Sequence, residues 1–146
     1  MSRPPVEVRL LGPEDGPVLD RVAADVFDGP VLPELAAEFL ADARHHLAVA
    51  IDAGVVVGMA SAVHYVHPDK RPELWINEVG VAPTHRRRGL ARDLLGALVE
   101  RARSLGCTGA WVLTESGNRA ARALYSAAGG EGDETTVLYA WRFDAD

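Results

Sequence analysis

The spacing of apolar and polar residues along this chain changes between a two-residue period and a helical period, and these periods predict its secondary structure. Strands are expected over residues 6–10, 47–51, 55–65, 73–82, 110–114 and 135–143. Helices are expected from Pro13 to Val26, over 33–43, from Gly89 to Gly106 and over 118–128. The middle strands, over 47–82, follow one another through short connections, which favours antiparallel pairing. The pattern predicts a mixed αβ sandwich, in which helices flank a central, mostly antiparallel sheet.

The helix that begins at Gly89 is the most regular of these elements. Its apolar positions recur on one face, as expected for a helix that packs on a sheet. They are Leu90, Leu94, Leu95, Leu98 and Ala102. Gly106 provides a natural stop, because glycine readily adopts the left-handed conformation that ends many helices.

Composition indicates one soluble domain. The chain has 146 residues, of which 48% are apolar and 25% charged, so we expect a single domain over residues 1–146. It has no run as long as a membrane span, no basic and then apolar leader, and one cysteine. We therefore expect a cytoplasmic protein without a disulfide framework or a membrane partner.

The net charge of −6 argues against a nucleic-acid partner and is compatible with attraction of a cationic amine. Acidic residues gather in two stretches, one in the early helical region and one near the end of the chain. They are Asp25, Asp28, Glu34, Glu38 and Asp42, followed by Glu131, Asp133 and Glu134. From the charge pattern alone, these residues are consistent with an ordinary solvated surface.

Residues 79–91 join an apolar strand end to a basic turn that opens a helix. The turn over 86–91 can direct successive backbone N–H groups at one point, where the positive end of the helix favours an anion. Gly89 has no Cβ that would obstruct a phosphate. The segment therefore predicts a pyrophosphate site; the alternative is a solvated run of arginines before an ordinary helix.

Two motifs resemble those of the GCN5-related N-acetyltransferase (GNAT) family. Arg-x-x-Gly-x-Ala after Val-x-Val, in residues 79–91, is similar to the family's acyl-CoA signature. Residues 118–129 are similar to its Asn-x-x-Ala-x-x-Leu-Tyr-x-x-x-Gly segment. The two segments stand in the family's order, with chain enough between them for a helix, a strand and a turn. The resemblance implies a GNAT-like fold and acetyl-CoA as cosubstrate.

By this resemblance, backbone groups of Val79 and Val81 hold the pantetheine arm, and Asn118 contacts it, unless Asn118 only caps its helix. The residues implied to hold the pyrophosphate are Arg86, Arg87, Arg88, Gly89, Leu90, Ala91 and Arg92. The arginine side chains could add charge-assisted contacts to phosphate.

Acetyl transfer needs a neutral amine and a proton for the departing thiolate. Tyr125 matches the family tyrosine that donates this proton at the cofactor sulfur; the alternative is a tyrosine packed on the sheet. Glu78 interrupts an apolar strand and is the candidate base, acting through water on the expectation that it is partly buried. It could instead orient the substrate or lie at solvent. Strand alternation directs Asn77 to the opposite face unless a bulge intervenes.

Other titratable residues are weaker candidates. His64 and His67 are reserves for proton transfer. Cys107 has no evident histidine partner, so direct transfer in a ternary complex is expected rather than an acyl-cysteine. The chain shows no metal-ligand spacing, since His45 and His46 are neighbours at an expected helix end and cannot face one ion together.

The chain also resembles the aminoglycoside 3-N-acetyltransferase branch, on residues 26–27, 46–50, 56–58, 73–81 and 85–87. It departs from that branch at Glu78, where aspartate is usual, and at Gly130, where many relatives carry an apolar or aromatic residue. By the family resemblance, the two acidic stretches can border the acceptor site. The expected acceptor is a small cationic amine, with an aminoglycoside as the leading guess. Alternatives are a protein or peptide acceptor, or an acyl-CoA sensor without turnover. The final strand could pair two subunits in a homodimer.

Overall fold

The structure, a computed structural model, describes residues 5–144 and divides into two compact units. The first unit is Met1–Leu113 and the second is Thr114–Asp146. Each is described by itself. The prediction of one domain over the whole chain stays a prediction.

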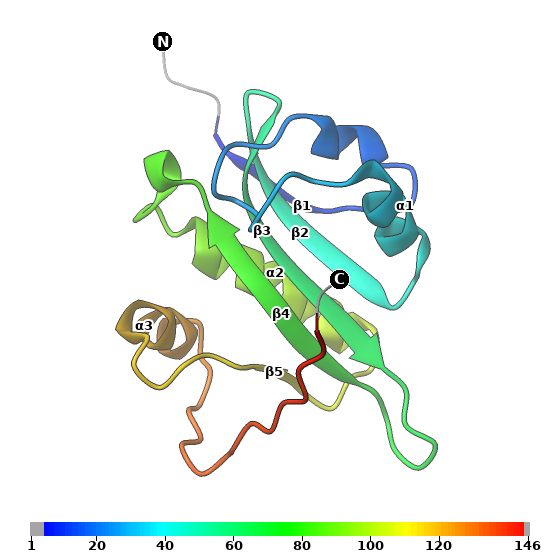
Figure 1. The fold of residues 1–146 in the computed structure, drawn as a ribbon, viewed down its shortest axis with the longest axis vertical. Helices are drawn as coiled ribbons and strands as arrows, with labels where there is room; N and C mark the ends of the chain where they lie inside the picture. The colour runs from blue at the N-terminus through cyan, green and yellow to red at the C-terminus, as the bar shows by residue number, and fades with distance from the viewer. Residues whose placement is uncertain (1–4, 145–146) are drawn as a thin grey trace. The chain divides into compact units, whose positions relative to one another are not determined.

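The first unit is built on a five-stranded sheet in the order β1-β2-β3-β4-β5 (Figure 1). Its strands are β1 (Glu7–Leu10), β2 (His45–Asp52), β3 (Val55–Tyr65), β4 (Glu73–Val81) and β5 (Ala110–Val112). Neighbouring strands are antiparallel except β4 and β5, which are parallel. The predicted mixed, mostly antiparallel sheet is therefore confirmed.

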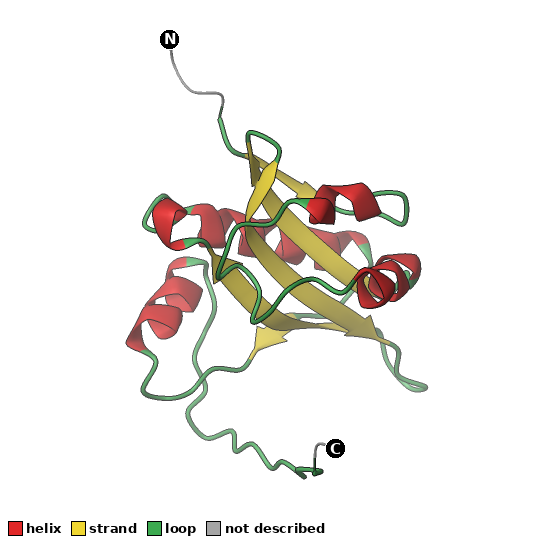
Figure 2. Cartoon of the chain, turned by 45° about the horizontal axis from the view of Figure 1, so that its top comes forward, coloured by secondary structure: helices red, strands yellow, loops and turns green. Residues whose placement is uncertain are grey.

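The helices α1 (Pro33–Ala41) and α2 (Leu90–Ser104) cover opposite faces of this sheet (Figure 2). A Cβ on Gly58 would lie 3.2 Å from Leu94 of α2, which identifies the α2 face. On the other face, the ring of Phe39 from α1 meets that of His45 at 4.9 Å. The predicted apolar stripe of α2 is buried as expected, together with the inward residues of β2 and β3.

The predicted helix from Pro13 to Val26 is wrong, because only a short 3-10 helix, η1 (Gly16–Asp20), forms there. Beyond it the chain is extended along β3. Val56 donates its N–H to the carbonyl of Arg21, and Ala23 donates to the carbonyl of Val56. These bonds satisfy the backbone that a helix would otherwise satisfy internally. The apolar residues recur at helical spacing, but the backbone of this segment pairs with β3 as a strand would.

Two further predictions, about β2 and β5, are wrong in part. His45 and His46 begin β2 rather than ending a helix. The strand expected over 110–114 ends at Val112 and is not buried: Ala110 is exposed, and Trp111 and Val112 are partly exposed.

Over residues 114–144, the described part of the second unit, the chain forms one helix, α3 (Arg119–Ala127). The strand expected over 135–143 is wrong: these residues are irregular. Its large apolar side chains are 69% to 90% exposed; they are Val137, Leu138, Tyr139, Trp141 and Phe143. A two-residue alternation makes a strand only where a neighbouring strand supplies hydrogen bonds. Pairing of this segment between subunits stays a prediction.

The helices of residues 5–144 include none that combines the length and the apolar character needed to cross a bilayer.

Candidate functional site

One edge of β4 is unpaired beyond the point where β5 ends. Pairing of β4 with β5 stops at Ile76 and Val112, whereas pairing with β3 continues to Val81. Ala82 then donates its N–H to the carbonyl of Val57 on β3. Because alternate residues direct their backbone groups to the same neighbour, Val79 and Val81 direct theirs to the open edge. These are the two residues that the sequence implicates in binding an extended amide chain.

A β-bulge stands next to this edge. Ser61 pairs with Glu78 and Ala62 pairs with Ile76, so Asn77 is the extra residue of β4. The bulge that would disturb strand alternation at Asn77 is therefore present. Glu78 pairs opposite Ser61 on the face away from α2, and both Asn77 and Glu78 are exposed rather than partly buried. The partial burial on which the assignment of Glu78 as a base depended is therefore absent, and the structure has the alternative placement, a carboxylate at solvent on the sheet face. The role of Glu78 stays a prediction.

The turn that follows β4 has the backbone of an anion site. After the 3-10 helix η2 (Pro83–His85), Arg87 and Gly89 both adopt positive φ, 64° and 77°. No hydrogen bond from the N–H groups of Arg87, Arg88 or Gly89 to another described residue occurs. Successive free N–H groups in a left-handed turn form a concave nest that binds anions.

The helix α2 extends this nest, because its first N–H groups also have no partner within the helix. Leu90, Ala91 and Arg92 occupy these positions, and the first bond into the helix is from Asp93 to the carbonyl of Gly89. The macrodipole of a 15-residue helix adds positive potential at the same point. A Cβ on Gly89 would meet no atom within 4 Å, so the space in front of it is open.

The arginines of the turn divide into two roles. Arg86 donates its Nε–H to the carbonyl of Val81 at 3.1 Å, which ties its side chain to the strand end. Arg87 and Arg88 are exposed and have no ion-pair partner among residues 5–144. They can therefore add charge to a bound phosphate without first breaking a contact.

The second motif lies in the other unit. Asn118 accepts the N–H of Ala121 at 3.0 Å through Oδ1, so it caps α3; its Nδ2 donates to no described residue. Tyr125 is half-buried, and burial raises the pKa of its phenol. A phenol carries its proton at neutral pH, as a general acid must, and the shift makes that proton harder to release to water. The candidate acid and the candidate base, Glu78, belong to different units.

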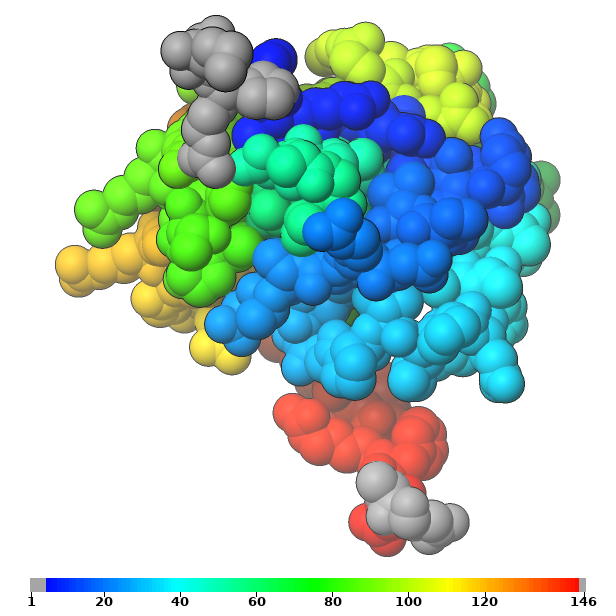
Figure 3. Space-filling view, turned by 90° about the horizontal axis from the view of Figure 1, so that it is seen from above, coloured from blue at the N-terminus to red at the C-terminus, as the bar shows by residue number. Residues whose placement is uncertain are grey.

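A hollow of about 420 Å³ lies in the first unit, lined by residues between Leu19 and Val31. Figure 3 shows this blue segment at the surface, beside the turn between β2 and β3. Asp20, Asp25 and Asp28 are among the lining residues. Val26, within the same segment, places its carbonyl against β4, because a Cβ on Gly80 would lie 2.1 Å from that oxygen. The segment that lines the acidic hollow therefore contacts β4 at Gly80, two residues from Glu78.

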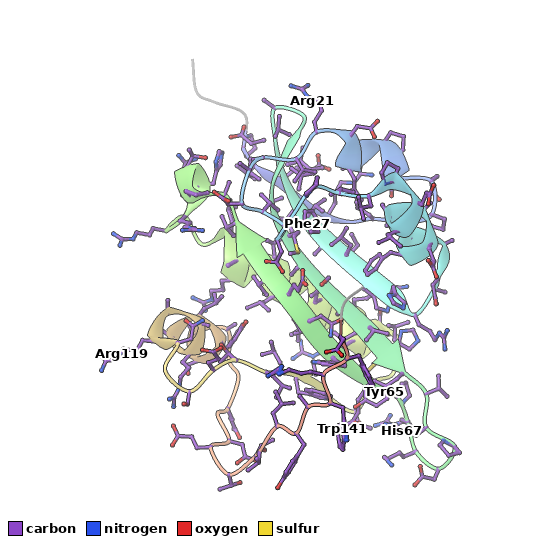
Figure 4. All side chains as sticks on the ribbon, viewed as in Figure 1. Arg21, Phe27, Tyr65, His67, Arg119 and Trp141 are labelled. Carbon is purple, nitrogen blue, oxygen red and sulfur yellow. The ribbon has the colours of Figure 1, made fainter. Side chains whose placement is uncertain are left out.

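Sequence reasoning missed the polar partners of four histidines. His46 and His64 share a 2.8 Å hydrogen bond on the α2 face, and His67 bonds Glu73 near Tyr65 at the end of β3 (Figure 4). His85, just before the turn, bonds Asp52. A histidine opposite another polar residue across a strand pair is a usable signal only once the register is known.

The remaining candidates for chemistry are the Cys107 thiol and any metal-binding group. Burial, with a smaller contribution from Glu73, raises the pKa of the Cys107 thiol, which keeps it in the weakly nucleophilic protonated form. Within residues 5–144 there is no group of three or more side chains with metal-ligand geometry.

Comparisons with known proteins agree with the fold. The model of the acetyltransferase (GNAT) family matches residues 18–129, more than half of the chain. No curated protein matches the chain by sequence. Among solved structures, an aminoglycoside acetyltransferase, meta-AAC0020, from an uncultured soil metagenomic sample and in complex with sisomicin, is 17% identical with a TM-score of 0.80. The match covers 95% of this chain and 97% of that one.

Two other solved structures are similar over nearly their whole length. Aminoglycoside N-acetyltransferase AAC(6')-Iy, in complex with CoA, is 22% identical with a TM-score of 0.74, over 94% of this chain and 95% of that one. Ribosomal-protein-alanine N-acetyltransferase from Brucella melitensis biovar Abortus 2308 is 21% identical with a TM-score of 0.70, over 95% and 100%. At these identities the likeness concerns the fold, and the resemblance to the 3-N branch in particular stays a prediction.

Proposed function

This chain belongs to the acetyltransferase (GNAT) family, and we propose that it transfers the acetyl group of acetyl-CoA to a primary amine of a small cationic acceptor. The observation that carries the proposal is the open edge of β4 leading directly into the amide-lined turn before α2. An acyl-CoA has the two matching parts: an arm of amide groups and, at its end, a pyrophosphate.

The backbone supplies most of the cofactor contacts in this proposal. Val79 and Val81 hydrogen-bond the pantetheine amides as a further strand would, although the Val81 carbonyl also accepts from Arg86. The N–H groups from Arg87 to Arg92 hold the pyrophosphate, with the side chains of Arg87 and Arg88 adding charge. Asn118 reaches the cofactor through Nδ2, because its Oδ1 is used in capping α3.

The reaction is a direct transfer in a ternary complex. Glu78 accepts a proton from the acceptor ammonium through a water molecule, which leaves a neutral amine. The amine nitrogen attacks the thioester carbonyl, the new C–N bond forms and the C–S bond breaks. Tyr125 donates its proton to the departing sulfur, because a phenol carries its proton at neutral pH. The nitrogen releases its second proton through water to the Tyr125 phenolate, which restores the phenol after its own proton has gone to the sulfur. The products are an N-acetyl amine and CoA with a free thiol.

Charge supports a cationic acceptor. The hollow over residues 19–31 contains Asp20, Asp25 and Asp28 and is anchored at Gly80, close along β4 to Glu78. Carboxylates around a hollow attract ammonium groups, and the net charge of −6 adds long-range attraction. An aminoglycoside has several ammonium groups on a rigid frame and remains the leading specific acceptor.

Acetyl-CoA-dependent thiol release tests the proposal, with purified protein and a panel of aminoglycosides, polyamines, amino acids and short peptides. Each acetylated product is confirmed by mass. Turnover of a polycationic amine is the expected result. Turnover of peptides alone would overturn the acceptor class, and CoA binding without any turnover would favour a sensor.

The cofactor site is tested separately by a matched pair of glycine variants. Gly89 and Gly106 lie at opposite ends of α2, share a φ of 77° and have no atom within 4 Å of an added Cβ. Gly89→Ala and Gly106→Ala therefore impose similar backbone strain. We expect only Gly89→Ala to weaken CoA binding, by roughly tenfold, because only its methyl group lies where the phosphate approaches. Equal CoA affinity in the two variants would count against the turn.

A further inference from the structure

A buried histidine–carboxylate pair joins the turn before α2 to a distant part of the sheet. His85 is the last residue of η2, immediately before Arg86, and Asp52 ends β2. The Nε2 of His85 lies 2.6 Å from Oδ2 of Asp52, and each side chain is only 12% exposed. A carboxylate can only accept, so the imidazole donates. A charge-assisted hydrogen bond away from solvent is stronger than a surface ion pair.

Both ends of this bond are held in place. Asp52 precedes a two-residue hairpin turn in which Ala53 and Gly54 have φ of 49° and 79°, as a tight hairpin requires. On the other side, the hydroxyl of Thr84 lies 2.8 Å from Nδ1 of His85, so both ring nitrogens have partners. The backbone N–H of His85 also bonds the carbonyl of Ala82. The ring therefore has one orientation.

The turn itself has few other supports. The N–H groups of Arg87, Arg88 and Gly89 bond nothing else in residues 5–144 and must stay free to receive an anion. After the turn, Leu90 is buried in the core and fixes the start of α2. Before it, the side chains that hold the backbone are His85, through Asp52, and Arg86, through the Val81 carbonyl.

We infer that Asp52 and His85 are positioning residues for the phosphate-binding turn. This inference rests on the proposed use of acetyl-CoA. Neither residue touches the phosphate; the pair fixes the path of residues 86–89 so that their N–H groups converge before the ligand arrives. Prior fixing of a loop raises affinity because the ordering cost is not incurred on binding.

The inference makes a selective prediction about ligands, because only part of the cosubstrate contacts the turn. Asp52→Asn and His85→Gln should weaken binding of CoA, with its pyrophosphate, by roughly tenfold. The KM for S-acetylpantetheine, which has no pyrophosphate, should change by less than about twofold, because the open edge of β4 is untouched. A pair that merely stabilised the fold would weaken both to the same degree.

The experiment measures CoA affinity by calorimetry and S-acetylpantetheine turnover for the full-length wild type and variants, with thermal melting of each. Arg9→Gln is the matched control, because it removes the 2.9 Å ion pair between Arg9 and Asp15 elsewhere in the same unit. We expect it to leave CoA affinity unchanged. If Asp52→Asn does not fold, His85→Gln carries the test.

Two results would overturn the inference and can be told apart. Unchanged CoA affinity in folded variants, or an equal loss for CoA and S-acetylpantetheine, would remove the positioning role while leaving the proposed function intact. Absence of CoA binding by the wild type would remove both proposals.

Discussion

The turn before α2 and the helix α3 carry the two family motifs, but they are held in place differently. α2 buries Leu90, Leu94, Leu95, Leu98 and Ala102 against the sheet. α3 has no buried residue, although its apolar side chains also lie on one face. Its order comes from its cap at Asn118 and from backbone bonds at its end, such as that from Gly130 to the carbonyl of Tyr125.

The two motif segments should therefore respond differently to substitution. In the first unit, packing of α2 on the sheet holds the backbone of the candidate site, so substitutions at its buried positions should change the free energy of unfolding. In α3, the candidate side chains belong to a helix with no fully buried residue, so we expect substitutions there to change the free energy of unfolding little. The predictions below test that separation.

The largest effect is expected at Gly80. A Cβ there would lie 2.1 Å from the carbonyl oxygen of Val26, so Gly80→Ala must push the 19–31 segment off β4. We expect the free energy of unfolding to fall by about 3 kcal/mol, as measured by urea denaturation. The control is Gly96→Ala, on the open side of α2, which should stabilise the protein by roughly 1 kcal/mol. Equal stability of the two variants would show that Val26 does not pack on β4.

Tyr125→Phe should have the opposite character, with a large kinetic effect and a small effect on stability. Loss of a general acid lowers kcat by roughly 100-fold, whereas CoA affinity should stay within about twofold. Steady-state kinetics and calorimetry measure the two quantities. Because no residue of α3 is fully buried and Tyr125→Phe removes only a hydroxyl from a half-buried ring, the urea midpoint should change little. A variant that retained wild-type kcat would remove Tyr125 from the mechanism.

Sequence alone predicted most of the first unit, because its elements carry strong local signals. The stripe of α2, the hairpin at Asp52 and the basic turn each have a pattern that needs no tertiary information. The helix expected from Pro13 failed because β3 supplied hydrogen bonds to residues 21–23 instead. The strand expected over 135–143 failed because a strand also needs a neighbour, which no local pattern reports.

The candidate site was also predictable only where a local sequence pattern marks its residues. Val79 and Val81 were chosen by motif, and the end of β5 explains why their backbone groups are available. The bulge at Asn77 could only be stated as a condition, since it depends on the register with β3. The pairing of Asp52 with His85 links residues far apart in sequence, so neither position alone suggested it.

Acidification should lower the free energy of unfolding by a smaller amount, through a buried histidine of the sheet. His46 is 6% exposed, and its pKa is lowered from 6.5 to about 4 by burial, with smaller contributions from His64 and Arg101. Below pH 6.5 the unfolded chain takes up a proton that the folded chain refuses. Stability from this group is therefore full above 6.5 and is lost as the pH falls toward 4.

The expected loss attributable to His46 between pH 7 and pH 5 is about 2 kcal/mol, from about 1.4 kcal/mol per pH unit. Urea unfolding at both pH values measures it, and His46→Gln should flatten the dependence by that amount. His45→Gln is the control, because His45 precedes it on β2 and lies on the opposite face, against Phe39. The same pH dependence in both variants would assign the acid sensitivity to other groups.

The smallest effect is expected at Asn118, where it separates capping from cofactor contact. Asn118→Ala removes the bond to the N–H of Ala121 and should cost α3 about 1 kcal/mol, seen as faster amide hydrogen exchange within α3 rather than in the sheet. Asn118→Asp keeps the accepting oxygen and therefore the cap, but it loses the Nδ2 donor. If Asn118 also binds pantetheine, Asn118→Asp should retain α3 protection and weaken CoA binding. If Asn118→Asp keeps both the exchange protection of α3 and the wild-type CoA affinity, Asn118 acts only as a helix cap.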